Sequence, residues 1–182
     1  MAANQVGKTY CGAMEMALHL TGRYPDNWGG RRFARPIRAW AGSKTGEVTR
    51  DSPQRYLIGE PKDRSQWGMG SIPQDCLVRT MTRQGIADAL DSAVVKHASG
   101  GNSTIGFKSY DQGREKWQGE TLDVVWFDEE PPFDIYMEGL TRTNSTGGMA
   151  YLTFTPLLGM SEVVRMFLTE ERDAARHADD NR

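Results

Sequence analysis

The first nine residues of the chain carry the pattern with the most specific chemistry. They end in Gly7-Lys8-Thr9 and fit the phosphate-binding loop G-x-x-x-x-G-K-[ST], except that Ala2 stands in place of its first glycine. In such a loop, successive backbone N–H groups surround the β- and γ-phosphates of a nucleotide, the lysine neutralises phosphate charge and the hydroxyl coordinates Mg²⁺. Lys8 and Thr9 would have these two roles. The surrounding loop would comprise Ala3, Asn4, Gln5, Val6, Gly7, Lys8 and Thr9.

A second group of residues that could take part in a reaction, three consecutive acids, follows the most apolar run of the chain. Residues 124–127 are four consecutive bulky apolar side chains, which predict a strand buried on both faces of a parallel sheet. Acids that follow such a strand lie where α/β proteins bind ligands. With a phosphate loop upstream, Asp128 is predicted to hold Mg²⁺, partly through water, and Glu129 to polarise the water that attacks the γ-phosphate of ATP. The alternatives are a solvated acidic loop or, for Glu130, a cap on the next helix.

A second polar strand end is predicted nearer the C-terminus. Residues 149–156 have the composition of a strand that breaks at Pro156. If this strand lies beside the acidic one, Thr153 or Thr155 could sense the γ-phosphate. The alternative is that these threonines only suit a strand.

The elements that must position these residues can also be predicted. An apolar helix follows the phosphate loop and directs its positive end at the anion, and Thr21-Gly22 ends it. Residues 87–98 suit either a helix or a strand, and a hairpin is predicted about the turn at 99–102. The helix after the phosphate loop is predicted at 12–20. The other predicted elements are a loop at 24–33 anchored by Trp28 and Phe33, a strand at 36–41, helices at 51–59 and 134–143, and a final helix capped by Ser161.

Size and composition exclude several classes of protein. A chain of 182 residues with 38% hydrophobic residues can bury one core, so one domain is expected. Cys11 and Cys76 lack C-x-x-C spacing, which favours a reduced, cytosolic protein. The three histidines are too far apart in sequence to suggest a zinc site. No apolar run has the 18 residues needed for a membrane span.

The net charge argues against the chain being a dedicated nucleic-acid-binding domain. The formal charge is −2, whereas such modules are usually strongly basic. The densest basic segment could nevertheless contact DNA phosphates, or it could be a solvated loop face. Its residues are Arg31, Arg32, Arg35 and Arg38.

Together these motifs resemble the ATPase domain of a tailed-phage terminase large subunit, the motor that packages DNA into proheads. The resemblance covers most of residues 2–170. It rests on the variant loop at 2–9, on segments 107–115 and 117–119 leading into 128–131, and on segment 153–159, which is similar to the coupling motif of that family.

The resemblance implies a role for each motif residue. Lys8 and Thr9 would bind MgATP, Asp128 would bind the metal, and Glu129 would be the general base. Residues 153–155, with Thr153 and Thr155, would couple hydrolysis to DNA movement. The implied cofactors are therefore ATP and Mg²⁺.

The resemblance also implies a fold and partners. The expected fold is an α/β, P-loop NTPase (RecA/ASCE-like) three-layer sandwich with a mainly parallel central sheet, whose first strand is missing here. The implied partners are double-stranded DNA, the portal protein, the small terminase subunit and further copies in a ring. The implied location is the host cytoplasm, transiently at the portal vertex of the procapsid.

One position departs from the family pattern. Many relatives have an arginine directly before the glycine of segment 117–119, where it acts on the ATP of a neighbouring subunit. Gln118 occupies that position here. The arginine-finger role would then pass to Arg114 or Arg142.

The extent of the resemblance sets the expected domain organisation. Residues 1–171 would form an N-terminally truncated ATPase domain with impaired adenine binding, and residues 172–182 a charged, frayed tail. No nuclease domain and no DNA cleavage are expected. One alternative is an inactive nucleotide-binding fragment of such a protein. Another is a helicase-like P-loop ATPase, although this length cannot hold the second RecA-like domain that such enzymes carry.

Overall fold

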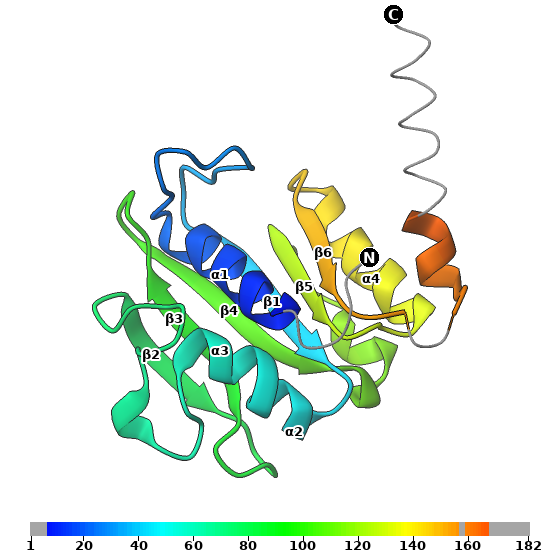
Figure 1. Ribbon diagram of the computed structural model, residues 1–182, viewed down its shortest axis with the longest axis horizontal. Coiled ribbons are helices and arrows are strands. Elements are labelled where there is room, and N and C mark those ends of the chain that lie inside the picture. The colour runs from blue at the N-terminus through cyan, green and yellow to red at the C-terminus, as the bar shows by residue number, and fades with distance from the viewer. Residues whose placement is uncertain (1–6, 157–158, 168–182) are drawn as a thin grey trace, which may run out of the picture.

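A single six-stranded sheet organises the chain (Figure 1). The computed structural model describes residues 7–156 and 159–167. The strands lie in the order β2-β3-β4-β1-β5-β6. Strands β4, β1, β5 and β6 are parallel, whereas β2 and β3 form an antiparallel extension beside β4. The bounds are β1 (Arg38–Ser43), β2 (Leu77–Thr82), β3 (Leu90–Lys96), β4 (Asn102–Ser109), β5 (Val124–Asp128) and β6 (Met149–Thr153).

Helices cover both faces of the sheet. One core cluster joins α1 and α3 to one face, and a second joins α4 and helix 162–167 to the other. The chain is therefore an α/β protein with a mixed, mostly parallel sheet between two helical layers, as predicted. The helical bounds are α1 (Lys8–Thr21), α2 (Gly46–Thr49), the π-helical η1 (Arg50–Gln54), α3 (Arg55–Ile58) and α4 (Phe133–Asn144); the 3₁₀ turns are η2 (Arg64–Gln66), η3 (Tyr110–Gln112) and η4 (Arg114–Trp117).

The uninterrupted apolar run of β5 is explained by these two layers. Successive side chains of a strand point to opposite faces, so Val124 and Trp126 pack in the α1 layer while Val125 and Phe127 pack in the α4 layer. All five residues of the strand are buried. Burying side chains of this size contributes roughly 1.5–3 kcal/mol each, so β5 is fixed firmly at the centre of the molecule.

Helix α1 approaches the sheet closely at Gly12. A Cβ at this position would lie 2.8 Å from both the Trp126 ring and the Thr153 methyl group. The Tyr151 hydroxyl also donates a hydrogen bond to the Gly12 carbonyl over 2.8 Å. The helix ends where predicted, at Gly22, whose φ of 66° is left-handed and suits glycine. These contacts hold the start of α1 above the carboxyl ends of β5 and β6.

Two segments differ from the sequence prediction. The helix predicted at 51–59 begins earlier, because the Thr45 side chain accepts a hydrogen bond from the Val48 N–H and caps α2. The helix then passes Pro53 within the π-helical η1, where the missing proline N–H is tolerated. Strand β2 was not predicted, since most of its side chains are exposed on the edge of the sheet and show no alternation.

Most other predicted elements are confirmed. The ambiguous segment 87–98 contains β3, which pairs with β4 as a hairpin about the predicted turn. Phe33 anchors the loop at 24–33 in the core, whereas Trp28 remains partly exposed. Ser161 caps the final helix by accepting a hydrogen bond from the Val164 N–H over 3.2 Å. Within the described part of the chain, no helix has the length and apolar character required to cross a bilayer.

Candidate functional site

A cavity of about 310 Å³ lies where α1 begins and the parallel strands β5 and β6 end. Ligands bind at this edge of open α/β sheets, and the start of a helix attracts anions. The described residues that line the cavity are Gly7, Lys8, Thr9, Tyr10, Tyr56, Glu129 and Thr153. The structure thus brings together the end of the predicted loop, one of the three acids and one of the two threonines. Loop residues Ala3, Asn4, Gln5 and Val6 lie outside the described residues.

The buried Asp128 carboxylate accepts three hydroxyl hydrogen bonds, two of them from Thr9 and Thr153, which line this cavity. Its Oδ1 accepts from Thr9 Oγ1 over 2.9 Å and from Thr153 Oγ1 over 2.8 Å. Its Oδ2 accepts from Ser52 Oγ over 2.7 Å. Trp126 Nε1 donates to Thr153 Oγ1 over 2.7 Å and so orients that hydroxyl toward the carboxylate. Three elements far apart in sequence therefore converge on one carboxylate, which we call the Asp128 hub.

Burial and hydrogen bonding act on the Asp128 pKa in opposite directions. Burial raises this pKa because the charged form loses water, while the three hydroxyls and the nearby Lys8 charge lower it. Burial dominates, and the net shift is upward from the ordinary aspartate value. A cation beside Asp128 would favour the ionised carboxylate.

Replacing Asp128 with Asn is expected to raise the melting temperature of the ligand-free chain at pH 7. Because the Asp128 pKa is higher in the folded than in the unfolded chain, ionisation costs stability as pH rises from the unfolded through the folded pKa. The amide does not ionise, so its advantage should shrink as pH falls toward about 4. Thermal unfolding monitored by circular dichroism at several pH values measures this.

Asp123→Asn is the matched control. Asp123 is also buried, but its carboxylate accepts two hydrogen bonds from the Arg35 guanidinium and one from the Arg38 N–H. Its amide variant should therefore be less stable than the unmodified chain. A lower melting temperature for Asp128→Asn at pH 7 would contradict the expected cost of the buried charge.

The Asp128 hub has the donor chemistry of a magnesium site. Among the described residues, no group of three or more His, Cys, Asp or Glu side chains could hold a metal by itself. Mg²⁺ commonly takes only one or two protein ligands and completes its shell with phosphate and water. Two adjacent ligands of an octahedral ion, each at roughly 2.1 Å, lie about 3 Å apart. The 2.9 Å between Thr9 Oγ1 and Asp128 Oδ1 fits that spacing.

Glu129 is held in a strained backbone conformation beside the hub. Its φ of 67° is unusual for a residue other than glycine. The Glu129 N–H donates to the Thr153 carbonyl over 3.0 Å, and the Tyr110 hydroxyl lies 3.0 Å from the Glu129 and Asp128 carbonyl oxygens. The Glu129 carboxylate lines the cavity, 4.0 Å from the Lys44 ammonium. Strain that surrounding contacts maintain is typical of functional positions.

Sequence reasoning missed three residues at this site. Ser52 looked like part of a helix start, Tyr110 was only one residue of segment 107–115 with no role of its own, and Lys44 had no distinguishing local pattern. Ser52 meets Asp128 across 76 residues of sequence and Tyr110 meets Glu129 across 19. Such contacts depend on strand order, which local patterns do not reveal.

Two predicted residues are absent from the described lining of the cavity. Thr155 follows the end of β6 and is half-buried. Glu130 lines a different cavity together with Lys44 and Pro132. The alternative that Glu130 caps the next helix is wrong, because Pro132 is the N-cap of α4.

The two candidate arginine fingers share one carboxylate. Glu138 on α4 is 5% exposed. Its Oε2 lies 2.9 Å from Arg114 Nε, and its Oε1 lies 2.9 Å from an Arg142 guanidinium nitrogen. The Arg114 side chain is 57% exposed and that of Arg142 is 24% exposed. Arg114 is thus the more accessible of the two.

The basic segment is largely occupied by contacts within the chain. Arg31 donates to the Gly147 carbonyl, Arg32 donates to carbonyls of the 24–33 loop, and Arg35 pairs with Asp123. These contacts favour a structural role for three of its four arginines. DNA binding by the segment stays a prediction.

Comparison with known proteins relates this geometry to a family. Residues 1–180 match the family described as "Terminase large subunit, T4likevirus-type, N-terminal". The chain is 45% identical over 185 residues to the terminase large subunit of Salmonella phage P22, covering 92% of this chain and 37% of that protein. It is 32% identical over 133 residues to the terminase large subunit of Enterobacteria phage LP7, covering 70% of this chain and 27% of that protein.

The comparison extends over only part of each relative. The chain spans little more than a third of the P22 protein and about a quarter of the LP7 protein. No solved structure matches it significantly. Both relatives and the family description nevertheless agree, so this chain belongs to the terminase large subunit family, in which it matches the N-terminal part.

Proposed function

We propose that this chain is the ATP-hydrolysing, P-loop NTPase part of a terminase large subunit that powers the packaging of double-stranded DNA. The observation that carries the proposal is the Asp128 hub, in which Thr9 of the phosphate-loop motif donates directly to the acid that ends β5. Thr9 and Asp128 are separated by 119 residues of sequence, and the fold brings their side chains into direct contact. Their contact supports a common role in binding a metal–nucleotide complex.

The side chains at the cavity can be assigned roles in the binding and hydrolysis of ATP. Lys8 and the N–H groups at the start of α1 would bind the β- and γ-phosphates. The Glu129 carboxylate would accept a proton from water as the water oxygen bonds to the γ-phosphorus and the bond to the β–γ bridging oxygen breaks. Lys8 would stabilise the charge that develops on the departing diphosphate. Mg²⁺, held by Thr9 and Asp128, would supply further charge neutralisation when bound.

The hub also offers a route from nucleotide to DNA movement. Thr153 contacts Asp128 through its side chain and Glu129 through its carbonyl, and it ends β6. A change in phosphate occupancy would alter these contacts and be transmitted to the segment that contains Thr155. In the working motor the proposed partners are double-stranded DNA, the portal protein, the small terminase subunit and other copies in a ring.

Two Thr9 variants test the metal–nucleotide site. Thr9→Ser keeps the hydroxyl, whereas Thr9→Val keeps the shape and loses it. We expect Mg²⁺ to strengthen ATP binding to the unmodified chain and to Thr9→Ser by about 10-fold. It should strengthen binding to Thr9→Val little, because that variant lacks the oxygen that would hold the ion. Calorimetric titration with ATP in Mg²⁺ and in chelator measures this. Equal affinities in both conditions for the unmodified chain would contradict the proposal.

Arg114→Ala is expected to separate catalysis from stability in the assembled motor. Because Arg114 is exposed and Glu138 keeps Arg142, its removal should cost the fold no more than about 1 kcal/mol. If Arg114 acts on a neighbouring subunit, the ATPase rate of the assembled ring should fall about 1,000-fold. Arg142→Ala is the parallel test for the second candidate. An unchanged ring ATPase rate would remove the candidate concerned.

A further inference from the structure

Ser52 has a different place in the Asp128 hub from the two threonines. Its Oγ donates to Asp128 Oδ2 over 2.7 Å, whereas Thr9 and Thr153 both donate to Oδ1. Both threonines line the phosphate cavity, but Ser52 is absent from the described lining. Any effect of the Ser52 hydroxyl on a bound nucleotide would therefore pass through Asp128.

The helical segment that carries Ser52 is irregular at that residue. The segment runs through α2, the π-helical η1 and α3 without a break, and Ser52 lies in η1 directly before Pro53. Proline lacks the N–H that a helix interior needs, and π-helical turns are rare but frequent at functional sites. Local sequence does not favour such a turn, so contacts with the rest of the fold maintain it.

Thr49 fixes this segment to the sheet on the N-terminal side of Ser52. The Thr49 side chain is buried. Its Oγ1 lies 2.9 Å from the Lys108 carbonyl, near the end of β4, and accepts from the Ser43 N–H, at the end of β1, over 3.2 Å. The start of the segment is thereby held at the carboxyl ends of two parallel strands.

Gln54 fixes the segment on the C-terminal side of Ser52. Its side chain is 1% exposed. The amide Nε2 donates to the Asp88 carbonyl over 2.9 Å, and Oε1 accepts from the Leu90 N–H, at the start of β3, over 2.8 Å. Both hydrogen-bonding groups of this buried amide are therefore used, and they hold the residues on either side of Pro53 in place.

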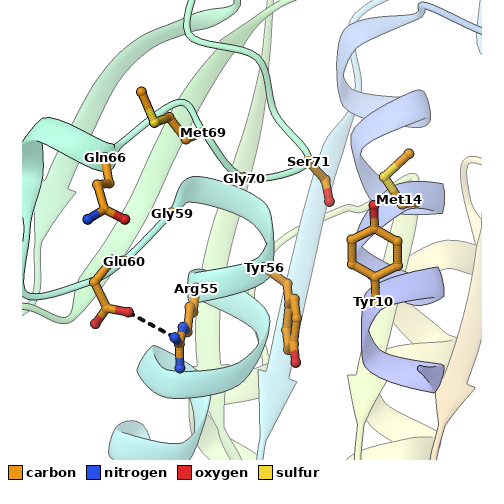
Figure 2. A pocket seen from close by; sticks show the side chains of 10 residues that line it. All are labelled: Tyr10, Met14, Arg55, Tyr56, Gly59, Glu60, Gln66, Met69, Gly70 and Ser71. Atoms are coloured by element: carbon orange, nitrogen blue, oxygen red, sulfur yellow. Dashed lines mark ion pairs between the residues drawn. The ribbon is translucent and has the colours of Figure 1, made fainter. Parts of the chain in front are cut away.

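An aromatic pair holds the end of the same segment against α1. Figure 2 shows Tyr56 on α3 facing Tyr10 on α1, beside the cavity that both line. The two rings stand edge to face, with centroids 6.2 Å apart and planes at 75°, an arrangement that aromatic pairs prefer. The Ser52 hydroxyl is thus presented to Asp128 by a segment that is fixed to β1, β3, β4 and α1.

This arrangement fixes the orientation of the Asp128 carboxylate. A carboxylate held at one oxygen alone can still turn about its Cβ–Cγ bond, because that torsion has a broad energy minimum. The Ser52 bond holds Oδ2 and so leaves Oδ1 directed at Thr9. We propose that Ser52 is a positioning residue, which holds Asp128 Oδ2 and keeps Oδ1 directed at the metal–nucleotide site. This inference rests on the proposed function.

The effect of Mg²⁺ on ATP affinity tests this role. Removing an outer group that orients a metal ligand typically costs roughly 10- to 100-fold in metal affinity. We expect Mg²⁺ to strengthen ATP binding about 10-fold in the unmodified chain and no more than about 2-fold in Ser52→Ala. Ser52→Thr keeps the hydroxyl and should keep the whole Mg²⁺ effect. Calorimetric titration with ATP in Mg²⁺ and in chelator gives each affinity.

The affinity in chelator separates positioning from a general effect on the fold. Without Mg²⁺, ATP binding depends on Lys8 and the N–H groups at the start of α1, which Ser52 does not contact. The affinity of Ser52→Ala for ATP in chelator should therefore stay within about 2-fold of that of the unmodified chain.

Ser65→Ala is the matched control. The Ser65 hydroxyl also donates to an aspartate, Asp63 Oδ1, over 2.6 Å, but this bond is exposed and lies at the η2 turn. The substitution removes the same pair of chemical groups without touching Asp128, so ATP should bind as it does to the unmodified chain in both conditions. Circular dichroism shows whether each variant is folded. If Ser52→Ala does not fold, Ser52→Cys takes its place, because its thiol is only a weak donor.

Three results would overturn the role of Ser52. A whole Mg²⁺ effect in Ser52→Ala would show that Asp128 keeps its orientation without the hydroxyl. Equal weakening of ATP binding in Mg²⁺ and in chelator would show that Ser52 supports the fold and not the carboxylate. Loss of the fold in both Ser52→Ala and Ser52→Cys would show the same. Absence of any Mg²⁺ effect in the unmodified chain would instead contradict the proposed function, and the role of Ser52 with it.

Discussion

Replacing Lys8 with alanine is expected to lower the rate of ATP hydrolysis by at least about 100-fold. Lys8 begins α1 and lines the cavity above the carboxyl ends of β5 and β6. In the proposed complex its ammonium neutralises charge on the β- and γ-phosphates, which grows on the departing diphosphate in the transition state. Removing one such preorganised charge or donor typically costs 100- to 1,000-fold in rate. Phosphate release under saturating and limiting ATP measures the effect on kcat and on kcat/KM.

Lys62→Ala is the matched control for charge. Lys62 is an exposed lysine in the turn after α3 and is absent from the described lining of the phosphate cavity. Its removal changes the net charge equally and should leave the ATPase rate within about 2-fold, because exposed charges at a distance are screened by salt. Equal losses of ATPase rate in the two variants would show that the rate depends on net charge and not on Lys8 itself. An unchanged ATPase rate in Lys8→Ala would contradict the role assigned to Lys8.

Replacing Glu129 with Gln is expected to lower kcat by about 100- to 10,000-fold, the usual contribution of a general base. The amide keeps the shape of the side chain but cannot accept the proton from the attacking water. The unusual φ of Glu129 is maintained by hydrogen bonds of its own backbone, from its N–H to the Thr153 carbonyl and to its carbonyl from the Tyr110 hydroxyl. Neither bond depends on the Glu129 carboxylate. MgATP affinity should therefore change by no more than a few-fold, since Lys8, Thr9 and Asp128 are untouched.

The neighbouring acid provides the control for Glu129→Gln. Glu130→Gln removes a carboxylate one residue away that lines a separate cavity, so the rate should stay within about 2-fold. Binding by calorimetry and turnover by phosphate release then separate affinity from chemistry. A Glu129→Gln chain with normal turnover, or one whose only defect is loss of ATP binding, would contradict the general-base role.

The parts of the site that local patterns predict are those carried by a single element. The apolar run of β5 indicated a doubly buried strand because each of its faces meets a helical layer. Its terminal acids were therefore predicted at the carboxyl edge of the sheet, where α/β proteins bind ligands. The helix stop at Gly22 could likewise be predicted, because its left-handed conformation favours glycine.

The parts that could not be predicted depend on contacts between distant elements. Ser52 lies in a π-helical turn, and nothing in its neighbours indicates that it will reach Asp128. The three hydroxyls on one carboxylate follow from the order of β1, β5 and β6 in the sheet and from the close approach of α1 at Gly12. Strand β2 had no alternating pattern because it lies at an edge where both faces meet solvent.

The central claim is that the contact between the phosphate-loop motif and the acids after β5 forms a working ATPase site. Phosphate release from MgATP by this chain, beside its Lys8→Ala and Glu129→Gln variants, tests that claim most directly. We predict turnover by the unmodified chain that both substitutions reduce by at least about 100-fold. Absence of turnover in the folded, unmodified chain, or turnover that neither substitution affects, would contradict it.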